Sequence, residues 1–339
     1  MSDNKYLVTG TPHIRDNASI RGIMLDVVIA LVPATVAGVF FFGAQAAVVV
    51  AVCIAACVFF EWAFKKVTKK DCTIGDLSAV VTGLLLGLNL PATVPLWLPI
   101  VGSFVAIIIA KELFGGIGQN FVNPALVGRM FLVAAYPVFM LTIPDPERTV
   151  DFGWFPAAVT GATPVDAATG ATPLALLSFT DFVPMTADYF DAVVGNIPGM
   201  IGETSAIALL LGGVYLLVRR IISWRIPVIY IATVAVLTFV LGRDGMFTGL
   251  WLYEVLIGGL ILGAFFMATD YSSSPVTPLG QIIMGLGCGV LTFAIRHYGG
   301  YPEGVAFAIL LMNLFVPLID KYTRPRVYGV TKKKKEAKA

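Results

Sequence analysis

The sequence predicts an all-α integral membrane protein with about ten transmembrane helices in two inverted repeats of five. Three observations predict this class: the composition, ten apolar runs along the chain, and an internal similarity between its halves. Of the 339 residues, 58% are hydrophobic and only 13% are charged, and the mean hydropathy is +0.86. Because soluble domains carry about 25% charged residues, most of this chain is expected to have lipid rather than water as its solvent.

The ten apolar runs are predicted to be helices that cross or enter the membrane. A complete crossing of about 30 Å needs about 20 residues at a rise of about 1.5 Å each. Several runs are shorter, and glycine or proline interrupts some, which is typical of broken helices inside a bundle. The runs are 24–43, 46–64, 77–90, 96–110, 124–141, 205–218, 227–241, 250–267, 279–295 and 304–319.

Charged residues fix the expected orientation. Basic clusters follow the second and sixth runs and fill the tail, whereas the connection 142–203 holds eight acids and Arg148 as its one base. Since basic loops stay on the cytoplasmic side, both termini are predicted to be cytoplasmic and this connection external. The expected organisation is a cytoplasmic segment 1–22, a first repeat 23–141, an extracytoplasmic loop 142–203, a second repeat 204–320 and a basic cytoplasmic tail 321–339.

The two halves share motifs at equal spacing. Gly83-Leu-Leu-Leu-Gly87 with Ala92-Thr93 recurs as Gly259-Leu-Ile-Leu-Gly263 with Ala268-Thr269, and Phe114-Gly115-Gly116 with Phe131 recurs as Tyr298-Gly299-Gly300 with Phe315. A unit with an odd number of spans must insert upside down when it is duplicated. The pattern therefore favours an inverted repeat, which places functional sites where the two halves meet.

The external loop contains a motif with a chemical meaning. It is a D-x-x-[ST]-G-A-T pattern formed by Asp166, Thr169, Gly170, Ala171 and Thr172. Small residues leave the backbone open to a large modifying enzyme. The pattern resembles the sequence on which a transferase esterifies flavin mononucleotide (FMN), through its phosphate, to the last threonine. A flexible small-residue turn is the alternative, and segment 160–164 repeats part of the motif without the leading aspartate.

Polar residues at membrane depth are expensive and are therefore functional candidates. Asn120 and Asn123 follow three glycines at a predicted helix break. Their amides suit the polar edge of a flavin ring or a cation. Alternatively, Asn123 caps a helix that begins at Pro124. The sequence leaves both interpretations open.

Asp270, at the end of a run in the second half, is either a solvated carboxylate or part of an ion pathway. The four cysteines are too few and too scattered for an iron–sulfur or metal site, so no metal is predicted. The charges flank apolar runs, so no nucleic-acid partner is predicted either.

Several segments together resemble the D subunit of the Rnf complex, the ion-translocating ferredoxin:NAD oxidoreductase, which is related to the B subunit of the sodium-pumping NADH:quinone oxidoreductase. The segments span nearly the whole chain in the expected order. They are Pro12-His13-Ile14, Ser78 to Gly87, Gly115 to Ala125, Asp166 to Leu174, Ala268 to Asp270, Ser274 to Pro278 and Gly304 to Asp320.

The resemblance implies an electron-transfer component of a bacterial or archaeal cytoplasmic-membrane complex that moves Na⁺ or H⁺. It implies covalent FMN on Thr172, attached by a flavin transferase, and a second, non-covalent flavin such as riboflavin near Asn120 and Asn123. Thr169 stands where the family often has serine. Sites for NAD and ferredoxin must then lie on partner subunits, so the chain is not catalytic alone. The competing classes are a channel or passive transporter without redox chemistry, and a scaffold.

The orientation is testable by cysteine labelling from each side of the membrane. A cysteine placed at Asp188 should react with an impermeant reagent added outside, and one placed at Lys332 only with reagent added inside, because of the positive-inside asymmetry. Labelling of the Asp188 position from the cytoplasm alone would reverse the topology.

Overall fold

The computed structural model describes residues 19–143, 172–179, 186–242, 245–247, 249–301 and 303–325. These residues confirm the all-α membrane fold. Apart from the helices, they contain one short antiparallel pair, β1 (Leu241–Gly242) with β2 (Gly245–Met246).

Each half contributes five helical segments in the described residues. The first half has α1 (Ile20–Phe42), α2 (Ala44–Thr68), α3 (Ser78–Leu88) after a short turn η1 (Ile74–Asp76), α4 (Trp97–Phe104) continued by the π-helix η2 (Val105–Glu112), and α5 (Pro124–Ala135) followed by α6 (Pro137–Leu141). The second half has α10 (Ala206–Val218), α11 (Arg225–Val240), α12 (Trp251–Leu256) with α13 (Leu260–Leu262) and the π-helix η5 (Gly263–Met267), α14 (Pro278–Tyr298) and α15 (Val305–Thr323). Between the halves lie α8 (Pro173–Phe179) and α9 (Thr186–Val194).

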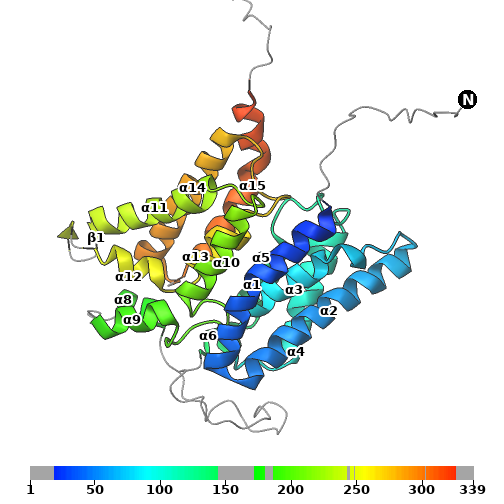
Figure 1. The fold of residues 1–339 in the computed structure, drawn as a ribbon, viewed down its shortest axis with the longest axis horizontal. Coiled ribbons are helices and arrows are strands. Elements are labelled where there is room, and N and C mark those ends of the chain that lie inside the picture. Colours follow the sequence, from blue (N-terminus) through cyan, green and yellow to red (C-terminus); the bar gives the residue numbers. More distant parts are fainter. Residues whose placement is uncertain are drawn as a thin grey trace, which may run out of the picture.

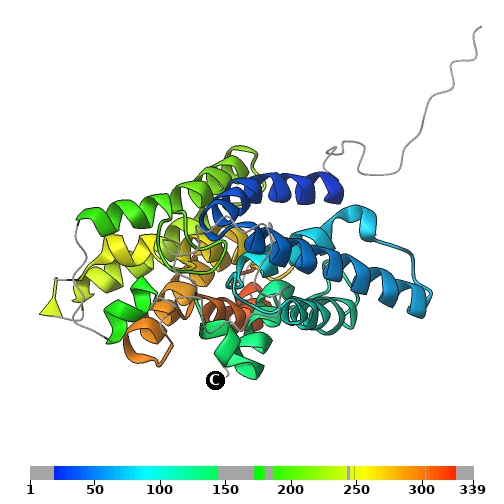
Figure 2. The ribbon, with the colours of Figure 1, turned by 90° about the horizontal axis from the view of Figure 1, so that it is seen from below.

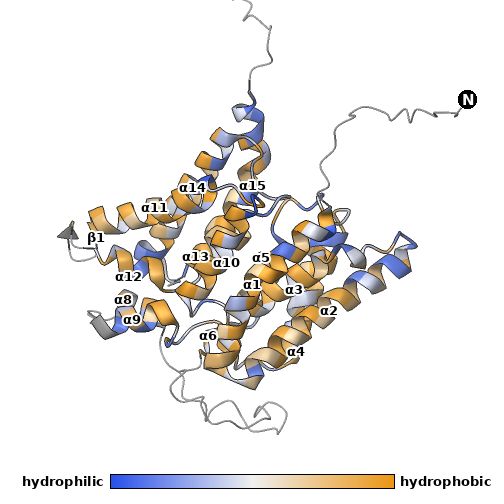
Figure 3. Ribbon diagram, viewed as in Figure 1, coloured by the Kyte–Doolittle hydropathy of each residue, from blue (hydrophilic) through white to orange (hydrophobic). Residues whose placement is uncertain are grey.

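Helix lengths agree with the mixture of full and short spans in the sequence. Among the described residues, α1, α2, α14 and α15 are long and apolar enough to cross a membrane, and four shorter apolar helices accompany them: α3, α5, α10 and α11. The count of ten spans stays a prediction, because the remaining segments are too short or too broken to count by length. Figure 3 shows hydrophobic residues over most of each helix and hydrophilic ones at the ends of α2 and α15.

Two runs expected to be continuous are broken, each for a local reason. The expected span 124–141 divides at Tyr136, which leaves the helical region because Pro137 follows it. The expected span 250–267 divides between α12 and α13, where Ile257 is extended and Gly258 has a φ of 72°. Both breaks leave backbone groups that a soluble protein would hydrate and that this protein must satisfy internally.

Helix starts follow from capping side chains. Ser19, Asn123, Ser205 and Thr277 each accept a hydrogen bond from a backbone N–H in the first turn of the helix that follows. Two of these caps precede a proline at the first helical position, where the missing N–H costs nothing. The polar residues between apolar runs therefore act as start signals.

The two halves lie side by side, the first on the right in Figure 1 and the second on the left. Their first helices, α1 and α10, pack together (Figure 2). Asp26, near the start of α1, pairs with Arg219, just beyond the end of α10, at 3.0 Å. These two helices therefore run in opposite directions, as an inverted repeat requires.

The chain enters α1 and leaves α15 at the upper face of Figure 1, whereas α6, α8 and α9 lie at the opposite face. The shared face of the two ends agrees with the predicted topology. Which compartment that face borders stays a prediction.

Small residues let the helices approach closely. A Cβ at Gly83 would lie 2.7 Å from Cα of Ile54, and one at Gly87 would lie 3.0 Å from Cα of Val50. The repeated glycine pair of the sequence is thus a contact face of α3 on α2, the usual device of helix packing in lipid.

Candidate functional site

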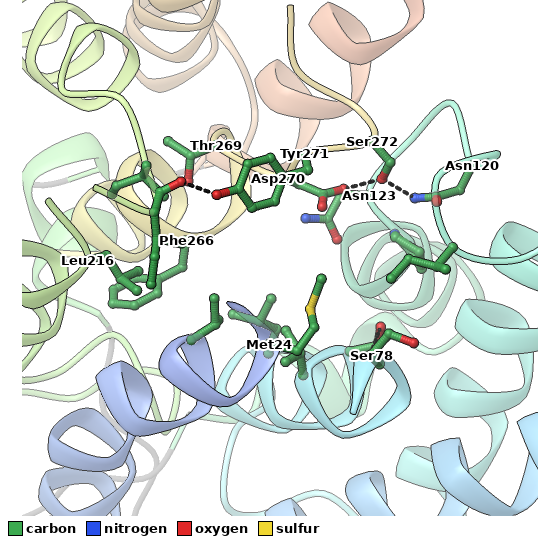
Figure 4. A pocket seen from close by; sticks show the side chains of 18 of the residues that line it. Met24, Ser78, Asn120, Asn123, Leu216, Phe266, Thr269, Asp270, Tyr271 and Ser272 are labelled. Carbon is green, nitrogen blue, oxygen red and sulfur yellow. Dashed lines mark hydrogen bonds between the residues drawn. The ribbon is translucent and has the colours of Figure 1, made fainter. Parts of the chain in front are cut away.

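A cavity of about 80 Å³ lies where the two halves meet (Figure 4). We call it the Asn123 cavity. The first half contributes Asn120 and Asn123 to its wall, and the second contributes Asp270, Tyr271 and Ser272. The structure thus brings three of the predicted site residues, Asn120, Asn123 and Asp270, to one place.

Asn123 is a helix cap, as one of the two interpretations predicted. Its Oδ1 accepts from the backbone N–H of Ala125 at 3.0 Å, and Pro124 is the first helical residue. Its Nδ2 also donates to the carbonyl of Met267 at 3.3 Å, at the end of η5. Asn123 therefore starts α5 and ties it to the second half.

Asn120 makes a second link between the halves. Its Nδ2 donates to the carbonyl of Val122 at 3.1 Å and to Oγ of Ser272 at 2.8 Å. Within the described part of the chain, Oδ1 of Asn120 accepts no hydrogen bond, so this acceptor remains for a ligand. Whether the amides bind a flavin stays a prediction.

Asp270 lies at the rim of the Asn123 cavity, half-buried rather than freely solvated. Its Oδ2 accepts from the hydroxyls of Ser272 and Ser273, each at 2.9 Å, and Ser272 continues the chain of hydrogen bonds to Asn120 (Figure 4). The carboxyl group is therefore held in place by neutral donors, and burial raises its pKa above the ordinary value although these hydrogen bonds oppose the rise.

Two buried ion pairs stand behind the cavity in the first half. Lys111, which lines the cavity, donates to Glu61 at 2.7 Å and to Ser78 at 2.6 Å. Lys65 pairs with Glu112 at 3.1 Å. Both lysines are matched one to one by a carboxylate, which is what burial of charge requires.

Thr172 lies at the opposite face, where it precedes α8 and borders a second cavity of about 70 Å³. We call it the Thr172 cavity. Oγ1 of Thr172 accepts from the N–H of Ala175 at 3.1 Å and donates to no group among the described residues. Four other residues of the predicted motif, Asp166, Thr169, Gly170 and Ala171, lie outside the described residues.

The wall of the Thr172 cavity contains a buried charged group that the sequence did not single out. Arg129 of α5 donates to Oδ1 of Asn89 at 2.6 Å and to Oε1 of Glu203 at 2.8 Å, and it also pairs with Glu303. Arg129 and Glu303 line the cavity together with Thr172. The remaining walls are mainly apolar.

The broken segments explain how Glu203 reaches this position. The N–H groups of Ile201 and Gly202 donate to the carbonyls of Leu90 and Leu88, which α3 leaves without helical partners. The loop therefore completes the end of α3 and presents Glu203 beside Asn89 and Arg129. Gly259 makes room, because a Cβ there would lie 2.5 Å from Oε1 of Glu203.

One helix joins the two cavities. Asn123 and Pro124 line the Asn123 cavity, whereas Arg129, Met130 and Val133 of the same helix line the Thr172 cavity. Asn123 and Arg129 are six residues apart, about 9 Å along a helix axis. Charged residues inside apolar runs are rare because they are costly at membrane depth, and on this ground Arg129, Lys111 and Glu61 could have been selected from the sequence. The sequence does not show, however, which residues they pair with.

Comparison with known proteins identifies a family and several close relatives. The sequence profile of the "NQR2, RnfD, RnfE family" matches residues 7–329. The chain is 48% identical to the D subunit of the Na⁺-translocating ferredoxin:NAD⁺ oxidoreductase complex of Acetobacterium woodii, with all of both chains covered. It is 45% identical to the D subunit of the proton-translocating ferredoxin:NAD⁺ oxidoreductase complex of Clostridium ljungdahlii (96% of this chain, 97% of the relative), and 38% identical to the D subunit of the ion-translocating oxidoreductase complex of Halorhodospira halophila (96% of each).

The Lys111–Glu61 pair gives a stability prediction. Lys111→Met should destabilise the protein by about 3–5 kcal/mol, because it leaves the buried Glu61 carboxylate without its cation. Adding Glu61→Gln should recover a large part of that loss, since the charge is then gone as well. Thermal unfolding of the purified protein measures both variants.

The matched control is Lys66→Met, one helix residue beyond Lys65, which removes the same charge at an exposed position. It should change stability by about 0.5 kcal/mol or less. Equal losses for Lys111→Met and Lys66→Met would show that the buried pair contributes nothing specific.

Proposed function

The chain belongs to the NQR2, RnfD, RnfE family, and we propose that it is the D subunit of an Rnf-type ferredoxin:NAD oxidoreductase complex, which transfers electrons within the membrane and takes part in moving Na⁺ or H⁺. Two relatives of nearly equal identity are named for different ions. The proposal therefore leaves the ion as one of these two. The partners are the other subunits of the complex, in the cytoplasmic membrane of the cell.

The proposed redox group is FMN bound through its phosphate to Thr172. The observation that carries this proposal is the position of Thr172, half-buried at the mouth of a cavity whose wall holds Arg129. Esterification needs a hydroxyl whose proton is not already committed, and among the described residues the Thr172 hydroxyl only accepts a hydrogen bond. A flavin transferase would install the cofactor from outside the membrane.

The residues present fit the flavin ring through their aromatic and apolar surface, and only partly in size. Tyr301 and Phe307 supply aromatic surface, whereas the charge of Arg129 is already paired with Glu203 and Glu303. Enclosed ligand sites measure about 300–1,000 Å³, so a cavity of about 70 Å³ holds part of a ring at most. The rest of the cofactor must lie outside it. When bound, the flavin supplies the capacity to accept and release electrons; the chain holds it in place and excludes water on the apolar side.

A second, non-covalent flavin is proposed at the Asn123 cavity, whose volume of about 80 Å³ likewise holds only part of the ring. The free acceptor of Asn120 and the polar rim with Asp270 support it, together with the contact between the halves that an inverted repeat offers to a ligand. Asp270 itself is proposed as an ion-pathway group, because its half-buried carboxylate faces the same cavity.

Substitution of Thr172 tests the covalent site. In Thr172→Ala, the peptide that contains residue 172 should have its unmodified mass, and the denatured band should lose its flavin fluorescence in the gel. Thr163→Ala is the matched control, since it alters the partial copy of the motif and should keep the flavin. Flavin that persists on Thr172→Ala would refute the assignment.

The second flavin is tested by a double variant that spares the helix cap. Asn123→Ser keeps a capping hydroxyl, and Asn120→Leu removes the amide. Each hydrogen bond lost to a buried ring edge costs about 1–3 kcal/mol, so affinity should fall by roughly ten- to a hundredfold per substitution. Flavin extracted by denaturant should fall while covalent flavin stays. If the extracted amount is unchanged, these amides serve only to join the halves.

A further inference from the structure

The charged cluster beside the Thr172 cavity holds more negative than positive groups. Glu203 and Glu303 both face the single guanidinium of Arg129. Glu203 is 2% exposed and Arg129 is 4% exposed, so water does not reach these two groups, whereas 23% of the Glu303 side chain is exposed. Asn89 completes the group as a neutral acceptor.

The next layer of side chains adds two basic groups, Arg296 and His297, and one carboxylate, Glu254. Arg296 of α14 donates through Nε to the backbone carbonyl of Glu303 at 3.2 Å and through Nη1 to that of Glu254 at 2.7 Å. Glu254 of α12 is also buried, and its carboxylate lies 3.6 Å from Nε2 of His297. Two arginines thus face three glutamates, with His297 neutral or charged at the far end. The other titratable group at the cavity is the phenol of Tyr301.

The geometry shows where the missing positive charge belongs. Oε2 of Glu203 is buried and has no hydrogen-bond donor among the described residues. The carboxyl groups of Glu203 and Glu303 lie within hydrogen-bonding reach of each other. Two carboxylates have no donor between them, whereas one protonated and one ionised carboxyl form a hydrogen bond. A single proton therefore satisfies both the orphaned oxygen and the charge.

The surroundings favour Glu203 as the protonated member. Burial raises the pKa of the Glu203 carboxyl well above its usual range, and the charge of Glu303 raises it further, against the effect of Arg129. The pKa of Glu303 lies below its ordinary value because the attraction of Arg129 and the hydrogen bond from Glu203 outweigh its burial.

We propose that Glu203 and Glu303 form a proton-binding site, and that the site gives its proton to the Thr172 cavity when the redox group there is reduced. Glu303 and Arg129 line that cavity, so the pair borders the place where the proton is needed. The proton-transfer step rests on the proposed flavin, whereas the proton-binding site does not.

The step balances in charge and atoms. Reduction of an oxidised flavin by two electrons, which the partner subunits supply, takes up at least one proton. The O–H bond of Glu203 breaks, an N–H bond forms on the flavin ring, and both carboxylates then face Arg129. A proton from the external solvent restores the resting state. The buried Arg129 makes the ionised pair tolerable, because it is a cation that does not titrate.

Infrared spectroscopy tests the site without the flavin. In the complete complex that carries Thr172→Ala, the C=O stretch of a buried protonated carboxylic acid should be present near neutral pH and shift in D₂O. Adding Glu203→Gln should abolish that band. Glu303→Gln should also abolish it, because Glu203 then ionises against Arg129. A band that is absent from the Thr172→Ala complex, or that survives both substitutions, overturns the proposal.

Glu112→Gln is the matched control, since Glu112 is equally buried and also has oxygens without a hydrogen-bond donor among the described residues, but a cation of its own, Lys65, balances its charge. It should leave the band unchanged. A band that disappears on adding Na⁺ at constant pH would identify a sodium site and reject the proton.

A second measurement tests the coupling in the flavin-bearing complex. Reduction of the Thr172 flavin should be slowed by D₂O in the native complex, and it should be slower in Glu203→Gln, because the flavin then takes its proton from solvent. An unchanged rate in Glu203→Gln rejects the transfer step and leaves the proton site standing. Absence of flavin from the native loop refutes the proposed function and leaves the infrared result untouched.

Discussion

The structure depends on one constraint: charges and broken backbone inside the membrane must find their partners within the protein. Arg129 shows how far this reaches. Its guanidinium joins α5 to the end of α3 through Asn89, to the loop before α10 through Glu203, and to the turn before α15 through Glu303. Removing one partner from such a buried pair costs about 3–5 kcal/mol, a large part of the stability of a typical domain. The cluster therefore fixes the position of both halves at the face that carries Thr172.

The same constraint explains why the broken helices are not defects. The end of α3 leaves carbonyls at Leu88 and Leu90, and the loop before α10 supplies N–H groups to both. Between α12 and α13, Gly259 has no side chain, and the carboxyl group of Glu203 occupies the space where a Cβ would lie. Each break thus receives a segment from elsewhere in the chain. Both cavities lie beside breaks of this kind. Because α5 runs between the two cavities, a displacement of α5 would change the shape of both.

The fold was largely readable from the sequence, and the charged clusters were not. Capping residues, prolines and apolar runs are local signals, and they located the helix starts at Asn123 and Thr277 to within a residue or two. The break at Tyr136 was also readable in retrospect, because proline disfavours a helical residue before it. By contrast, Glu203 and Glu303 lie 74 and 174 residues from Arg129, and no spacing rule relates them.

The position of Lys111 could not be predicted for another reason. It sits in the π-helix η2, whose wider turns shift the facing of later residues away from the 3.6-residue period.

The two faces of the protein differ in charge balance, and this difference bears on what each can do. Toward the face where the chain begins and ends, Lys65 and Lys111 meet Glu112 and Glu61, two cations against two carboxylates. These charges balance one another, so that cluster acts as a support for the Asn123 cavity. Toward the face of Thr172, Arg129 is the cation that pairs with the carboxyls of both Glu203 and Glu303. That group of three is neutral only when it holds one more positive charge, and it can release and regain that charge at modest cost because Arg129 remains. A site that gains and loses a proton can assist a neighbouring cofactor that gains and loses electrons. Thr172 is the residue that would carry such a group, and it borders the cavity that Arg129 and Glu303 line. The uneven charge of this cluster, rather than the fold as such, is therefore the feature on which the proposed proton transfer rests.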